Sequence, residues 1–585
     1  MAGFFLWDSS VSIASEKVQS SFGELDYKEG TYLHFKTWNI VIFQKKLYDI
    51  QNFKIFPDGI ICCTGTFGYK GKVYEQALNQ IFSEIQSNSI DLSAFWGSFS
   101  IIILNDRGVT LLRDGAGLSR IYQYSDQPVY SSSFAGLINI LDEKMTLNTV
   151  ASTELLASGV LTGDATIVNE IKRVLIGTPQ HHITVFESKA KEYSAPHNRT
   201  EALNQQIEIA KKYYTTVFND FLNYMPDIQF DIGITGGMDS RLNAVLAMHT
   251  VDKSKISLHT HWRKAGLNDS DYKYAHIFSE KTSIPLHIRE VIHPHDMSQD
   301  ELIANFEAAY ALSDGVIRPG CYWDEAYSTE NYRKNILQTP YLRLLGFGGE
   351  QYRNGERLPI KSGRSLKSWI KWEMLYFFAG RYFVSEHDAI QTENHIASNL
   401  RNVFIKNSNL NLKNYKEYIR QIQSPSYRSL QASIENRLGF CLNTFLDTQL
   451  SVPSLLCIPF LGKSLSFQLN MIKTISPETS AIPNGYGFNF NKGESALGKI
   501  RSNLWQIIPA YIKHPLYAKL KKHNISKHIP HLTEKHFFIS ELEEICKSTG
   551  IPLDFKKHRL VRSRSRLMLN LGYFLKKHTN KITTS

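Results

Sequence analysis

The N-terminal part of the chain alternates short apolar runs with polar turns, a pattern typical of β-structure. Apolar runs occupy residues 32–35, 40–43 and 59–62. The run Phe99–Leu104 is closed by Asn105-Asp106-Arg107-Gly108, and the apolar residues Val109–Leu112 follow directly. Because Gly supplies the unusual backbone angles that a tight turn needs, these two runs predict a hairpin. The first 140 or so residues are therefore expected to be rich in β-strands.

Near residue 200 the pattern changes to helical spacing, which leads into a buried strand over residues 228–234. A Gly-rich turn and a helix follow, with Leu242, Val245 and Leu246 on one face. A second strand is predicted at 256–260, a helix from Asp271 to Lys281, and a third strand at 286–288. This β-α-β-α-β order predicts a parallel sheet with right-handed crossovers. Beyond about residue 300 the pattern is mostly helical.

Composition narrows the class of protein. A chain of 585 residues is long enough for two to four folding units. Its 42 % hydrophobic and 21 % charged residues exclude a mainly disordered or fibrous protein. We expect no membrane span, because no apolar stretch reaches ~18 residues. The first residues contain no basic region, and an acid, Asp8, soon interrupts their apolar run, so they do not resemble a signal peptide. A cytoplasmic location is therefore expected.

The six cysteines form no CxxC pair, which favours free thiols in a reducing compartment and argues against zinc. The net charge of +11 is concentrated at the C-terminus. From Tyr511 to Ser585 the chain holds 16 Lys and Arg residues against five acids. This segment is either a binding surface for an acidic partner, RNA or anionic lipid, or a solvated tail.

The clearest candidate for chemistry is the turn Thr235-Gly236-Gly237-Met238-Asp239-Ser240, which follows a buried strand and opens a helix. Free amides and the helix dipole at such a turn favour an anion. The glycines let the backbone approach it closely, and Thr235 and Ser240 add hydroxyl donors. Asp239 would repel a phosphate unless Mg²⁺ bridges the two. The turn therefore predicts a site for a nucleotide pyrophosphate with Mg²⁺.

This turn resembles the SGGxDS loop of ATP pyrophosphatases, and the chain is most similar to the asparagine synthetase family, which includes β-lactam synthetases and lasso-peptide cyclases. Further segments resemble that family in order along residues 1 to about 515. They are Trp96–Ser100, Leu112–Gly117, Ile121-Tyr122, Ser131–Ser133, Thr166–Gly177, Thr260–Trp262, Asp314–Arg318, Gly346–Glu350 and Ile458–Leu461.

The resemblance implies an α+β, Ntn-type β-sandwich domain at 1–195, like a glutaminase, and an α/β PP-loop synthetase domain with a parallel sheet and many helices at 200–510. A basic extension at 511–585, helical or tail-like, follows. It implies an ATP-dependent ligase that uses Mg²⁺, adenylates a substrate carboxylate, releases pyrophosphate and passes the acyl group to an amine. Both substrates would be small molecules or peptides, and the oligomeric state is open, with a homodimer one option.

The resemblance also assigns roles to residues. Asp239 and Glu350 would hold the metal and, with Lys519, act in catalysis, although Lys513 lies as near as Lys519 to the family's late lysine. Asp314 and Arg318 would face the substrate. The nucleotide would bind Thr235, Gly236, Gly237, Asp239, Ser240, Thr260, Gly348 and Gly349.

Two departures from the family pattern change the expected activity. Position 2 is Ala2 and not the nucleophilic cysteine of a glutaminase, so we expect no glutamine hydrolysis. Phe347 stands where the family carries Glu or Tyr, so the general base must be another residue. The candidates for the base are His261, Glu356 and Asp314.

Two other functions stay open from the sequence. A PP-loop enzyme that modifies RNA would suit the basic C-terminal segment. Against this function, the chain lacks the CxxC pair that thiol chemistry would need. A non-catalytic ATP-binding protein would explain Ala2 and Phe347. A metal at His259 and His261 is disfavoured because the sequence offers no third ligand.

Overall fold

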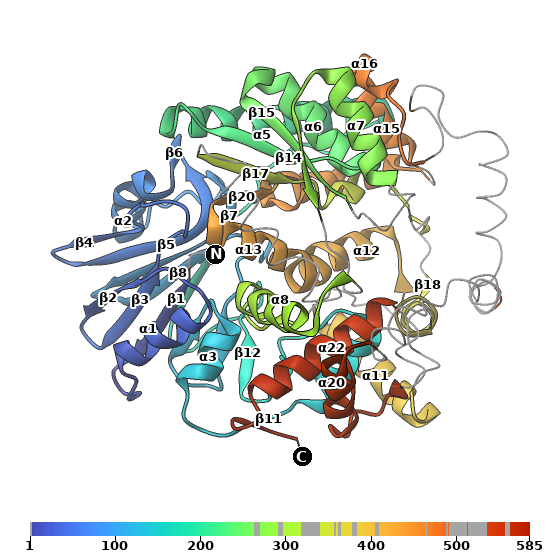
Figure 1. Ribbon diagram of the computed structural model, residues 1–585. Helices are drawn as coiled ribbons and strands as arrows, with labels where there is room; N and C mark the ends of the chain where they lie inside the picture. The colour runs from blue at the N-terminus through green and yellow to red at the C-terminus, as the bar shows by residue number, and fades with distance from the viewer. Residues whose placement is uncertain are drawn as a thin grey trace.

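A computed structural model describes residues 3–262, 270–290, 296–317, 340–355, 358–360, 364–376, 383–403, 409–462, 465–486, 490, 512, 535–555 and 562–584. Figure 1 shows two β-sheets in the N-terminal part, a third sheet flanked by helices, and a helical C-terminal part. Among the described helices, none is both long and apolar enough to cross a membrane.

The N-terminal region contains two six-stranded sheets. The first has the antiparallel order β12 (Ile171–Arg173), β9 (Tyr122–Tyr124), β10 (Val129–Ser131), β1 (Phe4–Asp8), β3 (Trp38–Phe43) and β2 (Gly30–Phe35). The second has the order β13 (Thr184–Glu187), β8 (Gly108–Arg113), β7 (Phe95–Asn105), β5 (Gly59–Tyr69) and β4 (Phe53–Phe56), with β6 (Lys72–Val73) paired to β5. Only β13 and β8 run parallel in it. The predicted hairpin is confirmed as β7 and β8.

The two N-terminal sheets share a hydrophobic core. Alternate residues of each strand point into it, as the period of two in a β-strand requires. The shared cluster contains Phe4, Leu6, Ile40 and Ile42 from the first sheet and Ile60, Cys62, Ile102 and Leu104 from the second. Helix α1 (Ser15–Glu24) covers the outer face of the first sheet, where Phe22 stacks on Phe43 with ring centroids 4.2 Å apart. The region is thus a β-sandwich with helices outside.

A five-stranded parallel sheet follows, with the order β16 (Leu286–Glu290), β15 (Ile256–Trp262), β14 (Gln229–Gly233), β17 (Tyr341–Leu345) and β20 (Phe440–Asn443). Helices α5 (Arg199–Tyr224), α6 (Met238–Thr250) and α7 (Ser270–Thr282) accompany its first strands. The parallel sheet predicted from the sequence is confirmed. Strands β17 and β20 were not predicted, because each is only four or five residues long and Arg343 interrupts the apolar pattern of β17.

The remaining elements are mostly helical and connect the sheets. In the N-terminal part they are η1 (Tyr74–Ala77), α2 (Leu78–Gln86), α3 (Phe134–Ile140), β11 (Met145–Thr146) and α4 (Thr149–Ser158). Further along are η2 (Lys253–Lys255), α8 (Gln299–Leu312), η5 (Gly349–Tyr352), β18 (Arg364–Ser365), α10 (Leu366–Trp369), η6 (Ile370–Tyr376), α11 (Glu386–Val403), β19 (Asn409–Leu410), α12 (Leu412–Tyr418), η8 (Ile419–Arg428), α13 (Ser429–Leu438), η9 (Thr444–Leu446), α14 (Thr448–Ser451), η10 (Pro453–Phe460), α15 (Ser466–Ile475) and α16 (Pro477–Ser480).

The C-terminal segment folds back onto the N-terminal part. Helix α20 (Phe537–Lys547) packs against α22 (Arg562–Lys577), and both lie near α8 in Figure 1. Strand β21 (Ile582–Thr583) pairs in parallel with β11. The Lys581 ammonium donates to the carbonyls of Ile138, Asn139 and Leu141 at 2.7–3.0 Å, at the end of α3. The described part of the basic segment is therefore helical and packed, with buried residues such as Leu567 and Phe574.

Candidate functional site

The strand order of the parallel sheet identifies its binding edge. Chain connections run outward from β14 in one direction to β15 and β16, and in the other to β17 and β20. At such a switch point the loops that leave two adjacent strands diverge, and ligands of open α/β sheets bind in the crevice beyond the carboxyl ends. The two loops here are residues 234–237 after β14 and 346–348 after β17. Both carry motifs that the sequence analysis singled out.

The first loop is organised by its own hydroxyl groups. The Thr235 and Ser240 hydroxyl oxygens are 2.9 Å apart, and the Gly237 amide donates to the Thr235 oxygen at 3.0 Å. The Gly236 amide donates to the carboxylate of Asp271 at 3.0 Å. Gly237 is the N-cap of α6 and has no side chain to bond the first-turn amides. These amides and the positive end of the helix dipole face the loop, which suits an anion.

One side of the loop is packed shut and the other is partly open. Gly236 is buried, and a side chain there would meet Tyr274 and Gly485 at 3.0–3.1 Å. Gly237 and Ser240 are partly exposed, and the Asp239 side chain is 25 % exposed. Solvent therefore reaches part of the loop beside Asp239.

The second loop meets the first at close range. Gly348 has φ of +98°, a left-handed conformation that favours glycine, and it starts the turn η5. A Cβ atom at Gly349 would lie 2.6 Å from a carboxylate oxygen of Asp239, so only glycine fits there. Gly348 and Gly349 are thus needed to bring η5 against the first turn of α6. The structure places Gly349 beside Asp239, whereas Gly348 packs against Phe445 and Leu446.

Asp239 has two polar partners. Both terminal nitrogens of Arg353 donate to its carboxylate, one of them at 3.1 Å, and the Gln468 amide donates at 2.8 Å. Burial raises the pKa of Asp239, and the charge of Arg353 opposes that shift. The bidentate arginine is the strongest kind of partner that a carboxylate finds among side chains.

Glu350 has its own cationic partner. Arg428, the last residue of η8, forms an ion pair with its carboxylate. Burial alone would raise the pKa of Glu350, but Arg428 and Arg353 bring it below its ordinary value. Helix η8 has the i→i+5 hydrogen-bond pattern of a π-helix. This pattern is rare in proteins as a whole and is often found at functional sites.

A buried lysine completes the cluster. The Lys416 ammonium donates to the carbonyl oxygens of Glu350 and of Arg353, the latter at 2.6 Å. Burial lowers the pKa of Lys416 to about 8. Asp239, Glu350, Arg353, Arg428 and Lys416 together give three cations and two carboxylates. We call these five residues the switch-point cluster, and its excess of positive charge favours an anionic ligand.

The donor set can be compared with what Mg²⁺ needs. No group of three or more His, Cys, Asp or Glu side chains in the described part of the chain could hold a metal ion. Mg²⁺ at nucleotide sites is commonly bound by one or two carboxylates together with phosphate oxygens and water. Asp239 and Glu350 fit that requirement in number, and each shares its charge with an arginine. These residues would therefore accept the ion only along with a phosphate ligand.

Other predicted residues are distributed differently. Thr260 lies in β15, next to β14, and its hydroxyl is buried without a hydrogen-bond partner. Asp314 accepts hydrogen bonds from the Ser133 hydroxyl and from the Phe134 amide, the latter at 2.7 Å, so it caps α3 in the N-terminal region. Burial raises the pKa of Asp314 to about 6. No contact of Asp314 with the switch-point cluster is present among the described residues. Ala2, Arg318, Glu356, Lys513 and Lys519 lie outside the described residues.

Two weaker candidates from the sequence also have structural explanations. His259 is hydrogen-bonded through Nδ1 to Asp231 at 2.8 Å, and Arg343 contacts its other ring nitrogen. Cys62, Cys63, Cys441, Cys457 and Cys546 are buried free thiols, while Cys321 lies outside the described residues.

Sequence reasoning missed Arg353, Arg428, Lys416 and Gln468. Only Arg353 carried a local signal, since it lies three residues after Glu350 in the same turn region. The other three come from η8, α12 and α15, and no spacing rule links those elements to the loop.

Comparison with known proteins does not identify the chain. No protein-family model matches it, and no curated protein matches it significantly. The resemblance to asparagine synthetases therefore rests on the motifs themselves.

Proposed function

We propose that the protein is an ATP-dependent ligase that activates a carboxylate and transfers the acyl group to an amine, without hydrolysing glutamine. The observation that carries this proposal is the meeting of Asp239, which follows the Gly236-Gly237 loop, with Gly349 and Arg353 at the switch point of a parallel sheet. The strand order and the loop sequence are what a PP-loop synthetase would have. The N-terminal β-sandwich is compatible with an Ntn-type domain that has lost glutaminase activity.

The proposed chemistry has two steps. A carboxylate oxygen attacks the α-phosphorus of ATP, and the bond to the leaving pyrophosphate breaks with its electron pair on pyrophosphate. An amine nitrogen then attacks the acyl carbon, AMP leaves, and the amine loses a proton. The first step creates negative charge on pyrophosphate, and fixed positive groups placed there lower its barrier.

The residues of the switch-point cluster would supply those groups. The N-terminal end of α6 and the two hydroxyls of Thr235 and Ser240 would bind the leaving phosphates, and the Gly236 and Gly237 amides, which donate to Asp271 and Thr235, would have to exchange those partners to join them. Arg353 and Lys416 would offset their charge, and Asp239 and Glu350 would hold Mg²⁺. When bound, Mg²⁺ neutralises phosphate charge as a Lewis acid. Phe347 is 40 % exposed and has no proton acceptor, so the amine proton must pass to another group.

The test is pyrophosphate release by the full-length protein with ATP, Mg²⁺ and mixtures of carboxylates and amines. Release that requires both substrates, with AMP formed in equal amount, is the expected result. Asp239→Ala should abolish release while circular dichroism and thermal unfolding show a folded protein. Asp106→Ala is the matched control, because Asp106 is an exposed acid paired with the exposed Lys36 at 2.8 Å. Normal turnover by Asp239→Ala would contradict the assignment.

One observation favours a second function, that of an ATP-binding protein without catalysis. Arg353 already occupies the carboxylate proposed to hold the metal. If this pair persists with nucleotide bound, the protein would bind ATP and release no pyrophosphate. Equilibrium binding of a non-hydrolysable ATP analogue, measured beside the release assay, distinguishes the two functions.

A further inference from the structure

A cavity lies where the N-terminal region faces η8, and none of the five residues of the switch-point cluster lines it. Its volume is about 80 Å³. Its walls come from β12 and the segment after β8, from α4, from residues 316–317, and from η8 through Gln421, Pro425 and Ser426. Most of the lining is apolar and includes Leu155, Leu161, Val174, Ile176 and Ile317. An apolar cavity with a few converging polar groups is the usual form of a small-molecule site.

The polar groups of this cavity are arginines. Arg113, Arg120 and Arg173 all line it. Arg113 is 2 % exposed and donates to the carbonyls of Ser119 at 3.0 Å and of Val174 at 2.6 Å. Arg173 donates to the Ser426 hydroxyl at 2.8 Å and to the carbonyls of Leu161 and Gly163. All these acceptors are neutral.

Neither Arg113 nor Arg173 has an ion pair with a carboxylate of the described residues. The Nε atom of each is also buried without a hydrogen-bond partner. Burial lowers the pKa of both guanidinium groups, and the charges of Asp114 and Glu187 near Arg113 and of Glu154 and Asp164 near Arg173 oppose that shift only in part. A buried charge is costly unless it is directly paired, so an anion in contact with these guanidinium groups would be favoured.

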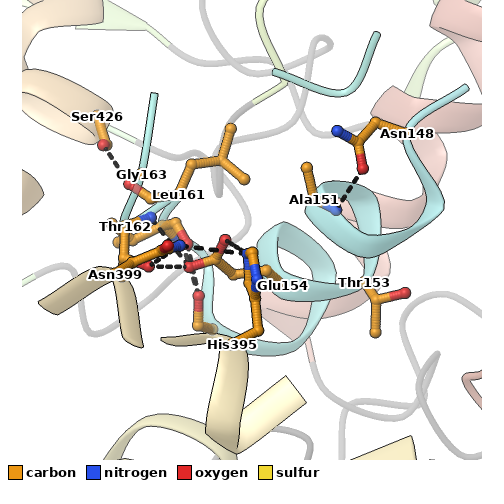
Figure 2. Close-up of polar contacts among 12 residues, drawn as sticks. Asn148, Ala151, Thr153, Glu154, Leu161, Thr162, Gly163, His395, Asn399 and Ser426 are labelled. Carbon is orange, nitrogen blue, oxygen red and sulfur yellow. Dashed lines mark hydrogen bonds and ion pairs between the residues drawn. The ribbon is translucent and has the colours of Figure 1, made fainter. Parts of the chain in front are cut away.

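The carboxylates nearest to these arginines are engaged elsewhere. Asp114 accepts from the amides of Leu118 and Ser119, both at 2.8 Å. Figure 2 shows Glu154 turned toward Thr162 and His395. Glu154 accepts from the Thr162 amide at 2.9 Å and lies 3.5 Å from the His395 ring nitrogen. The charges of both acids act on the neighbouring arginines, but neither acid forms an ion pair with Arg113 or Arg173 in the described part of the chain.

We propose that this cavity binds a small organic carboxylate, with its charge against Arg113 and Arg173 and its short chain against the apolar wall. A cavity of about 150 Å³ can hold benzene, which has six non-hydrogen atoms, so one about half that size suits a carboxylate of one or two carbons, such as acetate. A carboxylate matches the planar, forked geometry of a guanidinium group better than a spherical anion does. The proposal is independent of the ligase function, because it involves neither ATP nor the switch-point cluster.

The experiment is calorimetric titration of the full-length protein with sodium acetate, without nucleotide. Saturable binding of one acetate is expected. Arg173→Gln should weaken it at least about tenfold, because a charge-assisted hydrogen bond is lost. Arg107→Gln should leave it unchanged, since Arg107 is an exposed arginine bonded to Asn88 at 3.1 Å and lies outside the cavity.

Further arms of the same experiment give the result that would overturn the proposal. Ile176→Trp should fill the cavity and abolish binding without removing any charge, which keeps the test valid if Arg173→Gln fails to fold. Equal binding of ethanol would show that charge is not recognised. Binding of inorganic phosphate with none of acetate would overturn the carboxylate class. No heat of binding up to about 10 mM acetate would overturn the site altogether.

Discussion

Arg353 holds the Asp239 carboxylate in a two-point hydrogen bond, which joins the turn after β17 to the first turn of α6. The pair spans the point where the strand order of the parallel sheet reverses. It places a guanidinium where the sequence predicted a divalent cation. The two cations compete for one carboxylate, and that competition can be measured.

Removing the guanidinium should expose Asp239 to metal. We expect Arg353→Gln to bind Mn²⁺ more tightly than the unmodified protein in the absence of nucleotide, because the carboxylate loses its cationic partner. Electron paramagnetic resonance of free Mn²⁺ measures this. The double variant Arg353→Gln with Asp239→Asn should lose the gain. An affinity equal to that of the unmodified protein would mean that Asp239 is not a metal ligand.

The affinity for pyrophosphate should fall with rising pH. Burial lowers the pKa of Lys416 to about 8, so its ammonium loses the proton above that pH and the switch-point cluster loses one positive charge. We expect pyrophosphate binding, measured by calorimetry from pH 7 to 9, to weaken more in the unmodified protein than in Lys416→Met. Pyrophosphate also changes its charge over this pH range, but that change affects both proteins equally and cancels when their pH profiles are compared. Parallel profiles for the two proteins would exclude Lys416 from the anion site, and Lys36→Met serves as the surface control.

Lys581 should stabilise the fold by joining the C-terminal segment to the end of α3. Its ammonium meets three carbonyls at the C-terminal end of α3, where the helix dipole also favours a cation. Lys581→Met would leave these acceptors without their donor, at a cost of about 1–3 kcal/mol. Urea unfolding followed by circular dichroism gives the difference. Lys577→Met, which removes an exposed pair with Glu307 at 3.2 Å, should change stability by no more than about 1 kcal/mol.

His578 should make the protein less stable in acid. Burial and the charges of Lys581 and Lys577 lower its pKa to about 4, whereas an unfolded histidine titrates near 6.5. The unfolded state therefore binds the extra proton first, and stability is lost as pH falls from about 6.5 to 4. The contribution is about 3 kcal/mol. In His578→Gln, the free energy of unfolding in urea should decrease less between pH 7 and pH 5 than it does in the unmodified protein. Slopes equal to those of the unmodified protein would refute the assignment.

Local signals in the sequence predicted local structure well. The strand, Gly-rich turn and helix around Thr235–Leu242 follow from an apolar run and paired glycines, and the structure has β14 and α6 there. The hairpin of β7 and β8 followed from a turn with Gly108. Strands β17 and β20 escaped detection because short buried runs give no period to recognise.

The partners of the two acids could not be predicted in the same way. Arg353 lies 114 residues from Asp239 along the chain, and Gln468 lies 229 residues away. Which side chain reaches a carboxylate over such separations depends on helix packing. Asp314 illustrates the same limit, because a motif placed it beside the substrate and the fold has it cap α3 through Ser133. The general base, the substrates and the role of Lys519 stay predictions.

The pairing of β21 with β11 has a consequence for biosynthesis. Thr583 bonds to Met145 across 438 residues of chain, so the N-terminal half leaves the ribosome long before its last strand exists. At about 5–20 residues per second, the wait is roughly 20 to 90 seconds. During that interval the surface later covered by α22 and β21 is bare, and a nascent chain in this state is a natural client for chaperones.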